Sequence, residues 1–351
     1  MSPLFFKVAN AIMPPISGVL CAPAGYRRIG SVESSNKIRT IESVEFTQRF
    51  LGGELPIREM VARIRSTERF RALWLAEGLG QHYGNRVLRN NPEPRNLLTE
   101  GEGPDIPSDL MLMVHAGLAL SFARHHLDRL PRAASPAHVQ EATRRINALV
   151  ETNLLPGYAG IGYEAWGMVT RFFYLKAFRG VVKTLESLAP DRVPNIWHGA
   201  GRACYFLDFM PKWKDPWPVL KRIDREADGK ISRLNLLAGL GSVSVIVNMR
   251  TPEVLEALVR ERIAHLEADD IAAYSQGIAC SMVMRQDTTP EEENARALLR
   301  YRPAADMQDR WTAVVAEPAR LALDTLHPML KKRGRLDEIT RFVPLTEFAG
   351  S

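Results

Sequence analysis

The chain contains 351 residues, of which 46% are hydrophobic and 25% are charged, a composition typical of a globular protein with an extensive core. Its 46 basic and 40 acidic residues give a formal charge of +6, and both signs are interspersed, which excludes a basic tail of the nucleic-acid-binding kind. The three cysteines are too few and too dispersed for a disulfide framework or a zinc site, and no phosphate-binding glycine loop is present. We therefore expect no metal, no cofactor and no nucleic-acid partner.

The N-terminal residues do not fit a targeting segment. Residues 8–24 are apolar, but Lys7 is the only charge before them and Pro14 and Pro15 divide them, whereas a signal peptide has a basic start and an unbroken apolar middle. No stretch of the chain reaches the roughly eighteen uninterrupted apolar residues of a membrane span. The expectation is a cytoplasmic protein without a membrane span.

The first part of the chain contains several helix breakers. Residues 1–45 include four prolines and are expected to be irregular. Residues 46–50 and 55–79 have apolar side chains at helical spacing, which predicts amphipathic helices. The glycines within residues 78–84 are expected to interrupt this pattern, and residues 90–108 to form a loop. Residues 46–351 are predicted to form a single all-α domain.

A repeat extends from about residue 109 to about residue 300. Segments rich in small residues recur at intervals of roughly 35 to 48 residues, and an amphipathic segment follows each of them. The small-residue segments begin at His115, Tyr163, His198, Ala238 and Gln276. The pattern predicts an all-α protein of stacked helical hairpins, each about 40 residues long, that form an open solenoid or a closed α/α ring.

Two glycine-rich segments hold the candidate catalytic residues. Glu164 stands between Tyr163 and Trp166, where desolvation is expected to raise the carboxyl pKa and to suit the group to acid–base catalysis. His198 follows Trp197 and is the second candidate, because an imidazole in apolar surroundings can transfer protons. Two alternatives stay open: Glu164 forms an ion pair with an arginine, and His198 is a hydrogen-bonded core residue.

The remaining candidates are assigned to substrate binding. Arg202 lies four residues after His198, on the same helix face, and is suited to hold an anionic group. If the small-residue helices enclose one cavity, polar and aromatic side chains from several repeats converge on it; the alternative is that the aromatic residues belong to the core. The predicted substrate-binding residues are His115, Tyr163, Trp166, Trp197, Arg202 and Gln276.

Residues 224–235 resemble an EF-hand loop in part. Acidic residues occupy the first, third and fifth positions and glycine the sixth, but Asn235 replaces the bidentate glutamate at the twelfth. An acidic Asp-Gly turn between two helices is therefore favoured over a calcium site.

Four motifs in residues 109–285 resemble a bacterial family of unknown function. Its members have similar lengths and occur beside enediyne polyketide synthases and in related natural-product gene clusters. The motifs are residues 114–124, 163–165, 196–201 and 275–279. The resemblance implies a role in natural-product biosynthesis, and it supplies no catalytic residues.

Together these observations favour a biosynthetic enzyme for a hydrophobic small molecule. It is expected to enclose a long polyene or isoprenoid chain and to promote cyclisation or isomerisation by proton transfer, with Glu164 and His198 as acid and base. The alternative is a non-catalytic helical-repeat scaffold that binds a biosynthetic partner protein such as a polyketide synthase.

Overall fold

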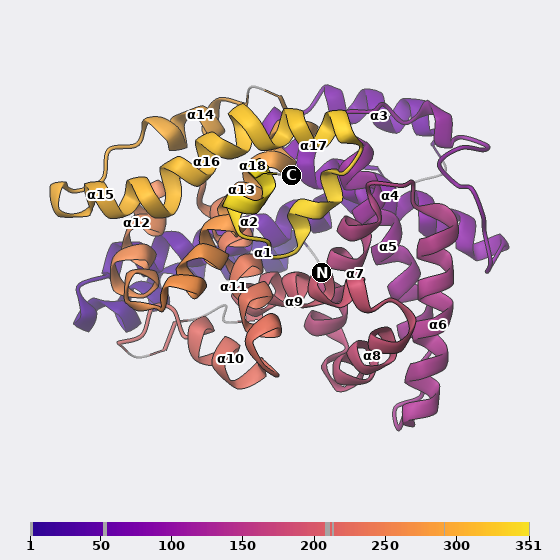
Figure 1. Ribbon diagram of the computed structural model, residues 1–351, viewed down its shortest axis with the longest axis horizontal. Coiled ribbons are helices and arrows are strands. Elements are labelled where there is room, and N and C mark those ends of the chain that lie inside the picture. Colours follow the sequence, from indigo (N-terminus) through magenta and orange to yellow (C-terminus); the bar gives the residue numbers. More distant parts are fainter. Residues whose placement is uncertain (1–2, 52–54, 208–210, 213, 291, 351) are drawn as a thin grey trace.

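The computed structural model describes residues 3–51, 55–207, 211–212, 214–290 and 292–350. These residues form helices and loops without a named strand, so the predicted all-α fold is confirmed (Figure 1). The helices are α1 (Pro3–Cys21), α2 (Arg27–Phe50), α3 (Ile57–Arg65), α4 (Arg69–Asn90), α5 (Met111–Leu127), α6 (Pro136–Asn153), α7 (Ala159–Phe173), α8 (Leu175–Leu188), α9 (Val193–Leu207), α10 (Val219–Glu226), α11 (Lys230–Asn248), α12 (Pro252–Glu261), α13 (Ala268–Thr288), α14 (Glu293–Arg300), α15 (Gln308–Trp311), α16 (Glu317–Leu321), α17 (His327–Arg333) and α18 (Leu345–Gly350).

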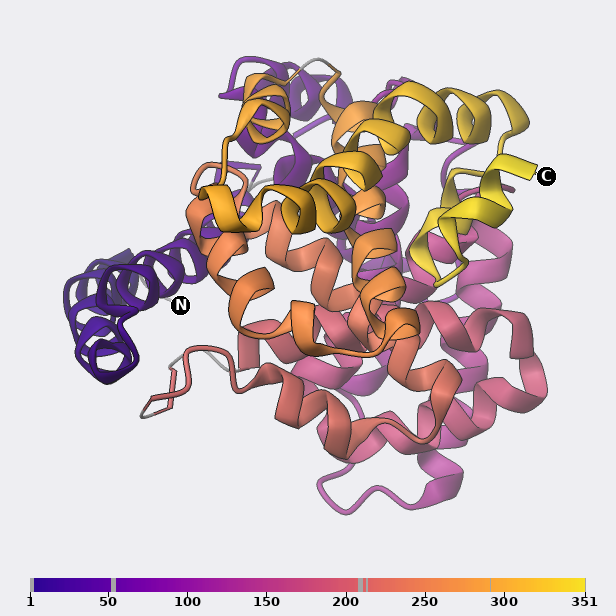
Figure 2. The ribbon, with the colours of Figure 1, turned by 60° about the vertical axis from the view of Figure 1, so that its left-hand side comes forward.

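The N-terminal residues form a helical hairpin. Helices α1 and α2 pack against each other and project from the rest of the molecule (Figure 2), so the expectation that residues 1–45 are irregular is wrong. Pro14 and Pro15 lie inside α1, where each removes a backbone donor. Packing outweighs this cost: a Cβ atom on Gly30 of α2 would lie only 2.4 Å from Sγ of Cys21, so the two helices are in close contact.

Six largely buried helices pack one after another in chain order. They are α4, α5, α7, α9, α11 and α13, and α13 also contacts α4 and α5. Helices α6, α8, α10 and α12 lie between them in the chain, and their amphipathic sequences leave one face exposed to solvent. The inner helices are rich in small residues, and the helices between them are not.

Glycines let the backbones of neighbouring inner helices touch. A Cβ atom on Gly199 of α9 would lie 1.8 Å from the carbonyl oxygen of Glu164 on α7. A Cβ atom on Gly239 of α11 would lie 1.9 Å from the carbonyl oxygen of His198 on α9. The same contact joins Gly117 to Glu77 and Gly277 to Ala238. No side chain fits at these crossings, which explains why glycine recurs in helices despite its low helix propensity.

These contacts establish the register of the repeat and correct the sequence alignment. The equivalent residues of the six inner helices are Glu77, Ala116, Glu164, His198, Ala238 and Gln276. The sequence alignment begins two segments at His115 and Tyr163, one residue before the equivalent positions, and it does not include α4. The expected interruption at residues 78–84 is also wrong, because Gly80 lies inside α4 and allows close contact with Val114 of α5.

The C-terminal region crosses the inner helices. After α17, residues 336–342, here called the C-terminal strap, lie against α7, α9, α11 and α13 (Figure 1). They include a short 3₁₀-helix, Leu336–Thr340. The strap therefore joins four inner helices, of which the first and the last are about 100 residues apart in the sequence.

Candidate functional site

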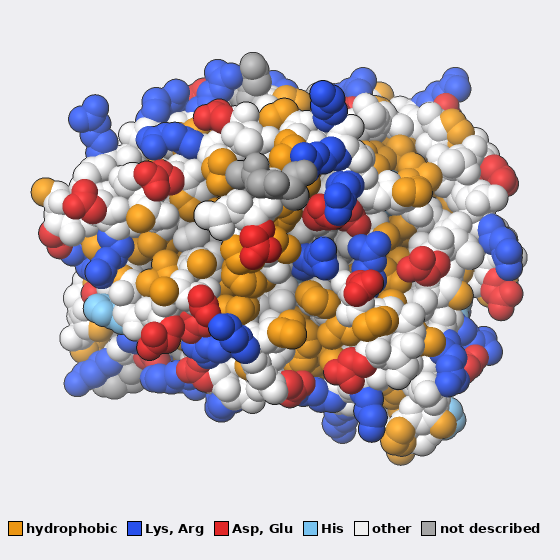
Figure 3. All heavy atoms as spheres, viewed as in Figure 1, with side chains coloured by type: hydrophobic (Ala, Val, Ile, Leu, Met, Phe, Trp, Pro, Cys, Tyr) orange, Lys and Arg blue, Asp and Glu red, His pale blue; other side chains and the backbone are white. Residues whose placement is uncertain are grey.

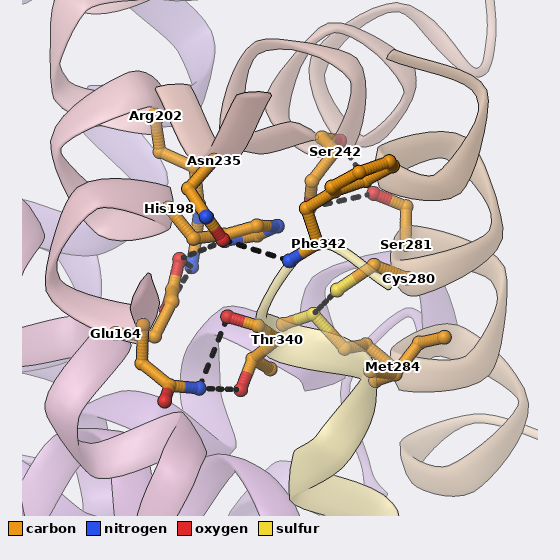
Figure 4. A network of polar contacts seen from close by, with 12 residues as sticks. Glu164, His198, Arg202, Asn235, Ser242, Cys280, Ser281, Met284, Thr340 and Phe342 are labelled. Atoms are coloured by element: carbon orange, nitrogen blue, oxygen red, sulfur yellow. Dashed lines mark hydrogen bonds and ion pairs between the residues drawn. The ribbon is translucent and has the colours of Figure 1, made fainter. Parts of the chain in front are cut away.

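Helices α7 and α9, which carry the predicted catalytic residues, bring three ionisable side chains together. One guanidinium nitrogen of Arg202, Nη1, lies 2.8 Å from both carboxylate oxygens of Glu164. Nδ1 of His198 lies 3.4 Å from Oε1 of Glu164. All three side chains are buried (Figure 4). The repeat places them in contact because Glu164 and His198 occupy equivalent positions on adjacent helices and Arg202 is one turn further along α9.

The ion pair determines the charge of Glu164. Burial raises the pKa of the Glu164 carboxyl, but the positive charge of Arg202 and the proximity of His198 outweigh burial, so the pKa falls below its ordinary value. Glu164 is therefore a carboxylate. The expectation that its carboxyl titrates at high pH is wrong, and the alternative of an arginine ion pair describes its environment.

Glu77 of α4 is a fourth ionisable residue of this cluster. It is buried, and desolvation together with the negative charge of Glu164 raises its pKa to about 7, although Arg202 lowers it. Among the described residues, Oε1 of Glu77 has no hydrogen-bond partner. Sequence reasoning missed Glu77, although Glu77-Gly-Leu-Gly repeats the spacing of His198-Gly-Ala-Gly. We call Glu77, Glu164, His198 and Arg202 the interior cluster.

Several polar atoms of the interior cluster have unused hydrogen-bonding capacity. In the described part of the chain, Nε2 of His198 and Nε of Arg202 lack partners, as does Oε1 of Glu77. Unpaired buried polar atoms are rare in folded proteins because each costs about 1–3 kcal/mol. Other buried polar atoms of the described residues also lack partners, among them Nε and Nη2 of Arg285.

Gln276 and two other amide side chains bind the C-terminal strap. Nε2 of Gln276 donates to the carbonyl oxygen of Ile339 at 2.7 Å, and Nδ2 of Asn195 donates to that of Thr340 at 3.1 Å. Oδ1 of Asn235 accepts a hydrogen bond from the backbone N–H of Phe342 at 2.7 Å (Figure 4). Gln276 is therefore in contact with the strap and lies on α13, a helix that holds no member of the interior cluster.

Further contacts hold the strap at α7. Oδ2 of Asp337 accepts a hydrogen bond from the backbone N–H of Gly160 at 2.8 Å and lies 3.2 Å from Nη1 of Arg192. The backbone N–H of Asp337 donates to the carbonyl oxygen of Gly157. The strap thus covers parts of α7 and α9 that precede the interior cluster in each helix.

His115 has a structural role in a different place. Its Nδ1 lies 2.6 Å from the carbonyl oxygen of Met111, its Nε2 accepts a hydrogen bond from the backbone N–H of Leu155 at 3.1 Å, and its ring stacks on Tyr158. Burial lowers its pKa to about 4, so the ring is neutral at pH 7. His115 joins α5 to the segment before α7 and contacts no member of the interior cluster through these bonds.

The predicted aromatic residues do not converge on the interior cluster through the contacts they make. The hydroxyl of Tyr163 lies 2.7 Å from Oδ1 of Asn147 and 2.6 Å from Oε1 of Glu151, both on α6. Trp197 packs edge-on against Phe178 of α8. Trp166 is buried and lies with its ring centroid 5.9 Å from that of Tyr163.

The acidic turn at residues 224–235 joins α10 to α11, as predicted. Its carboxylates pair with arginines: Asp224 with Arg233, Glu226 with Arg171, and Asp228 with Arg179. Among the described residues, no group of three or more His, Cys, Asp or Glu side chains is arranged to hold a metal ion.

The described pockets lie away from the interior cluster. A pocket of about 450 Å³ lies between the N-terminal hairpin and α4, and another of about 330 Å³ lies beside Arg171 and Leu175. Neither pocket is lined by a member of the interior cluster. The face seen in Figure 3 carries acidic and basic side chains side by side, with hydrophobic side chains between them.

The molecule therefore has a buried cluster of ionisable side chains. Three of its members were predicted as site residues from the sequence: Glu164 and His198 as catalytic residues and Arg202 as a substrate-binding residue. Comparisons of the chain with models of known protein families, with curated proteins and with solved structures found no match.

Proposed function

We propose that this protein is an enzyme that encloses a linear hydrophobic molecule and transfers a proton to and from it at the interior cluster. The observation that carries the proposal is the burial of two carboxyl groups, an imidazole and a guanidinium group in one apolar interior. Replacing buried ionic groups by hydrophobic residues is often neutral or stabilising in other proteins, so such a cluster has no general advantage for stability. Buried groups with shifted pKa values are typical of catalytic sites.

The proposed roles follow from the pKa directions of Glu77 and Glu164 and from the position of His198 beside Glu164. Glu77, with a pKa of about 7, is the proton donor, because its carboxyl group is still partly protonated at neutral pH. Protonation of a carbon–carbon double bond leaves a carbocation, and loss of a proton from a neighbouring carbon to Nε2 of His198 forms the new double bond. Glu164 stays ionised and stabilises the resulting imidazolium through its contact with Nδ1. Arg202 holds Glu164 in place.

The substrate chamber is proposed to lie among the inner helices. We infer that these helices close a ring, which is supported by the contacts of α13 with both α4 and α5. Since neither described pocket borders the interior cluster, the substrate needs an entrance that opens in part of the catalytic cycle. The C-terminal strap is the proposed entrance, because side-chain amides hold its backbone and it covers four inner helices.

The biosynthetic context rests on the resemblance of the four motifs to the family found beside enediyne polyketide synthases. It supports a polyene or isoprenoid chain as the substrate and cyclisation or isomerisation as the reaction. A polyketide synthase or another biosynthetic protein is the proposed source of that chain.

The test is chemical analysis of what the purified full-length protein contains. Organic extracts of protein isolated from cells that make the natural product are expected to contain a linear unsaturated molecule in stoichiometric amount. Mass spectrometry of the extract identifies it. Extracts that hold no such molecule, from protein that is folded and isolated under several conditions, contradict the enzyme proposal.

A second candidate is a scaffold that binds a biosynthetic protein without chemistry. It is favoured by one observation, the absence of the interior cluster from the linings of both described pockets. Affinity purification against neighbouring gene products tests it. A stable complex together with normal product formation by a Glu77→Gln variant supports the scaffold and excludes the enzyme.

A further inference from the structure

Helix α1 exposes an apolar stripe. Its large hydrophobic side chains Phe5, Val8, Ile12, Ile16 and Val19 are between 44% and 55% exposed. They recur every three or four residues, so they lie on one face of the helix. The opposite face is covered, since Phe6 and Ala9 pack against Ile38 of α2. One face of α1 thus packs against α2, and the opposite face is exposed to solvent.

The stripe differs from the other exposed hydrophobic residues of the described chain. Those include Phe173, Leu175, Leu188 and Ile231, which do not form a regular series along one helix. Isolated exposed hydrophobic residues are common on protein surfaces, whereas a continuous apolar face marks a binding surface. The sequence of α1 strengthens the contrast, because it has no acidic residue and Lys7 is its single charge.

Basic residues surround the C-terminal end of the stripe. Arg27 and Arg28 begin α2 directly after the turn, and both are exposed, although Nη2 of Arg28 also lies 3.4 Å from Oε1 of Glu253 on α12. Lys212 and Lys214 are exposed on a loop that reaches α1, where the backbone N–H of Lys214 donates to the carbonyl oxygen of Leu20 at 3.2 Å. An apolar face next to four positive charges is complementary to a partner with an apolar interior beneath a negatively charged surface.

We propose that the N-terminal hairpin docks on the surface of a bilayer that contains anionic phospholipids. The stripe of α1 enters the boundary between headgroups and acyl chains, and the four basic residues contact the headgroup phosphates. Helix α1 is long and apolar enough to cross a membrane, but its covered face packs on α2, which carries charged residues along its length. The helix therefore lies in the membrane surface. The proposal is independent of the proposed catalytic function.

Vesicle flotation of the full-length protein tests the proposal. The protein is expected to float with vesicles of phosphatidylcholine and phosphatidylglycerol, and to bind at least about ten-fold less to vesicles of phosphatidylcholine alone. High salt is expected to reduce binding to the anionic vesicles, because it screens the charges. A protein that stays unbound with anionic vesicles at low salt overturns the proposal.

A matched pair of variants locates the binding surface. Ile12→Asp places a charge in the stripe, and Ile231→Asp makes the same change at an isoleucine that is 68% exposed elsewhere. Ile12→Asp is expected to reduce vesicle binding about ten-fold or more, whereas Ile231→Asp leaves it unchanged. Both side chains are exposed, so circular dichroism is expected to show that both variants fold. Equal binding by the two variants contradicts the proposal.

Two further measurements separate lipid binding from self-association. Arg27→Glu combined with Arg28→Glu is expected to abolish the preference for anionic vesicles. The molecular mass in solution without lipid is expected to be that of a monomer. A dimer that Ile12→Asp converts to a monomer shows that a second copy of the chain covers the stripe, and it overturns the proposal.

Discussion

The guanidinium group of Arg202 lies 2.8 Å from both carboxylate oxygens of Glu164, and both side chains are buried. The two residues are 38 positions apart in the sequence and meet because Gly199 lets α9 touch the backbone of α7. The pair keeps one negative and one positive charge in the interior, and both charges act on the pKa of Glu77.

Removal of the Glu164 charge is expected to destabilise the fold. Glu164→Gln leaves Arg202 buried without its counter-charge, which costs about 3–5 kcal/mol in other proteins. Denaturant unfolding measures the change in the free energy of unfolding. Glu141→Gln, which removes the partner of Arg145 on the exposed face of α6, is the control and is expected to have no measurable effect. Equal effects of the two changes would show that the interior pair is not desolvated.

The close glycine contacts predict that adding a single methyl group, by a change from glycine to alanine, strongly lowers the free energy of unfolding. Gly239→Ala places a Cβ atom 1.9 Å from the carbonyl oxygen of His198, so α9 and α11 have to separate. We expect a loss of roughly 3 kcal/mol or more in the free energy of unfolding, at the upper end of overpacking effects. In Gly229→Ala the added Cβ meets nothing within 4 Å and the backbone is extended, so that variant is expected to unfold like the parent protein.

Glu77 predicts a pH dependence of stability with a definite sign. Its pKa is raised from 4.5 to about 7 in the folded protein, so between these values the folded state binds more protons than the unfolded state. The contribution of Glu77 to the free energy of unfolding is therefore fully present below pH 4.5, and it is lost as the pH rises to about 7. Glu77→Gln removes the dependence and is expected to be more stable than the parent at pH 8 by up to about 3 kcal/mol.

Unfolding of both proteins at several pH values checks this prediction. His115 has the opposite effect, because its lowered pKa makes stability rise with pH between about 4 and 6.5. The difference between the parent and Glu77→Gln cancels this contribution. A difference that is constant from pH 4 to pH 8 would mean that Glu77 has the same pKa in both states.

The C-terminal strap is expected to depend on its side-chain amides. Asn235→Ala removes the acceptor of the Phe342 N–H group, so hydrogen–deuterium exchange at residues 336–342 is expected to become faster by about ten-fold or more. Asn147→Ala on α6, which removes a partner of the Tyr163 hydroxyl, serves as the control and leaves exchange in the strap unchanged. Unaltered exchange in Asn235→Ala means that other contacts hold the strap.

The sequence predicted the helical architecture because the spacing of apolar residues depends on local geometry. Residues 243–248 are rich in β-branched side chains, and their place in the repeat correctly predicted a helix, α11. Glycine was harder to interpret. The same residue ends a helix in one setting and permits close contact in another, so sequence alone predicts an interruption at the glycines of α4.

The candidate site was predicted in part. Glu164, His198 and Arg202 were identified from their polar nature in apolar surroundings, but the charge of Glu164 depends on its distance to Arg202, which no local pattern contains. His115 bonds to Leu155, 40 residues away, and this contact makes it structural. Glu77 was missed because the register becomes visible only when each glycine is seen against the carbonyl group of the preceding inner helix.

In the proposed mechanism the interior cluster transfers protons and Glu77 is the donor. The most direct test replaces Glu77 by Gln in the producing cells and measures the final product together with the stability of the purified variant. We predict that the product is lost while the free energy of unfolding at pH 7 is unchanged or increased. Normal product formation by a folded Glu77→Gln protein would contradict the account.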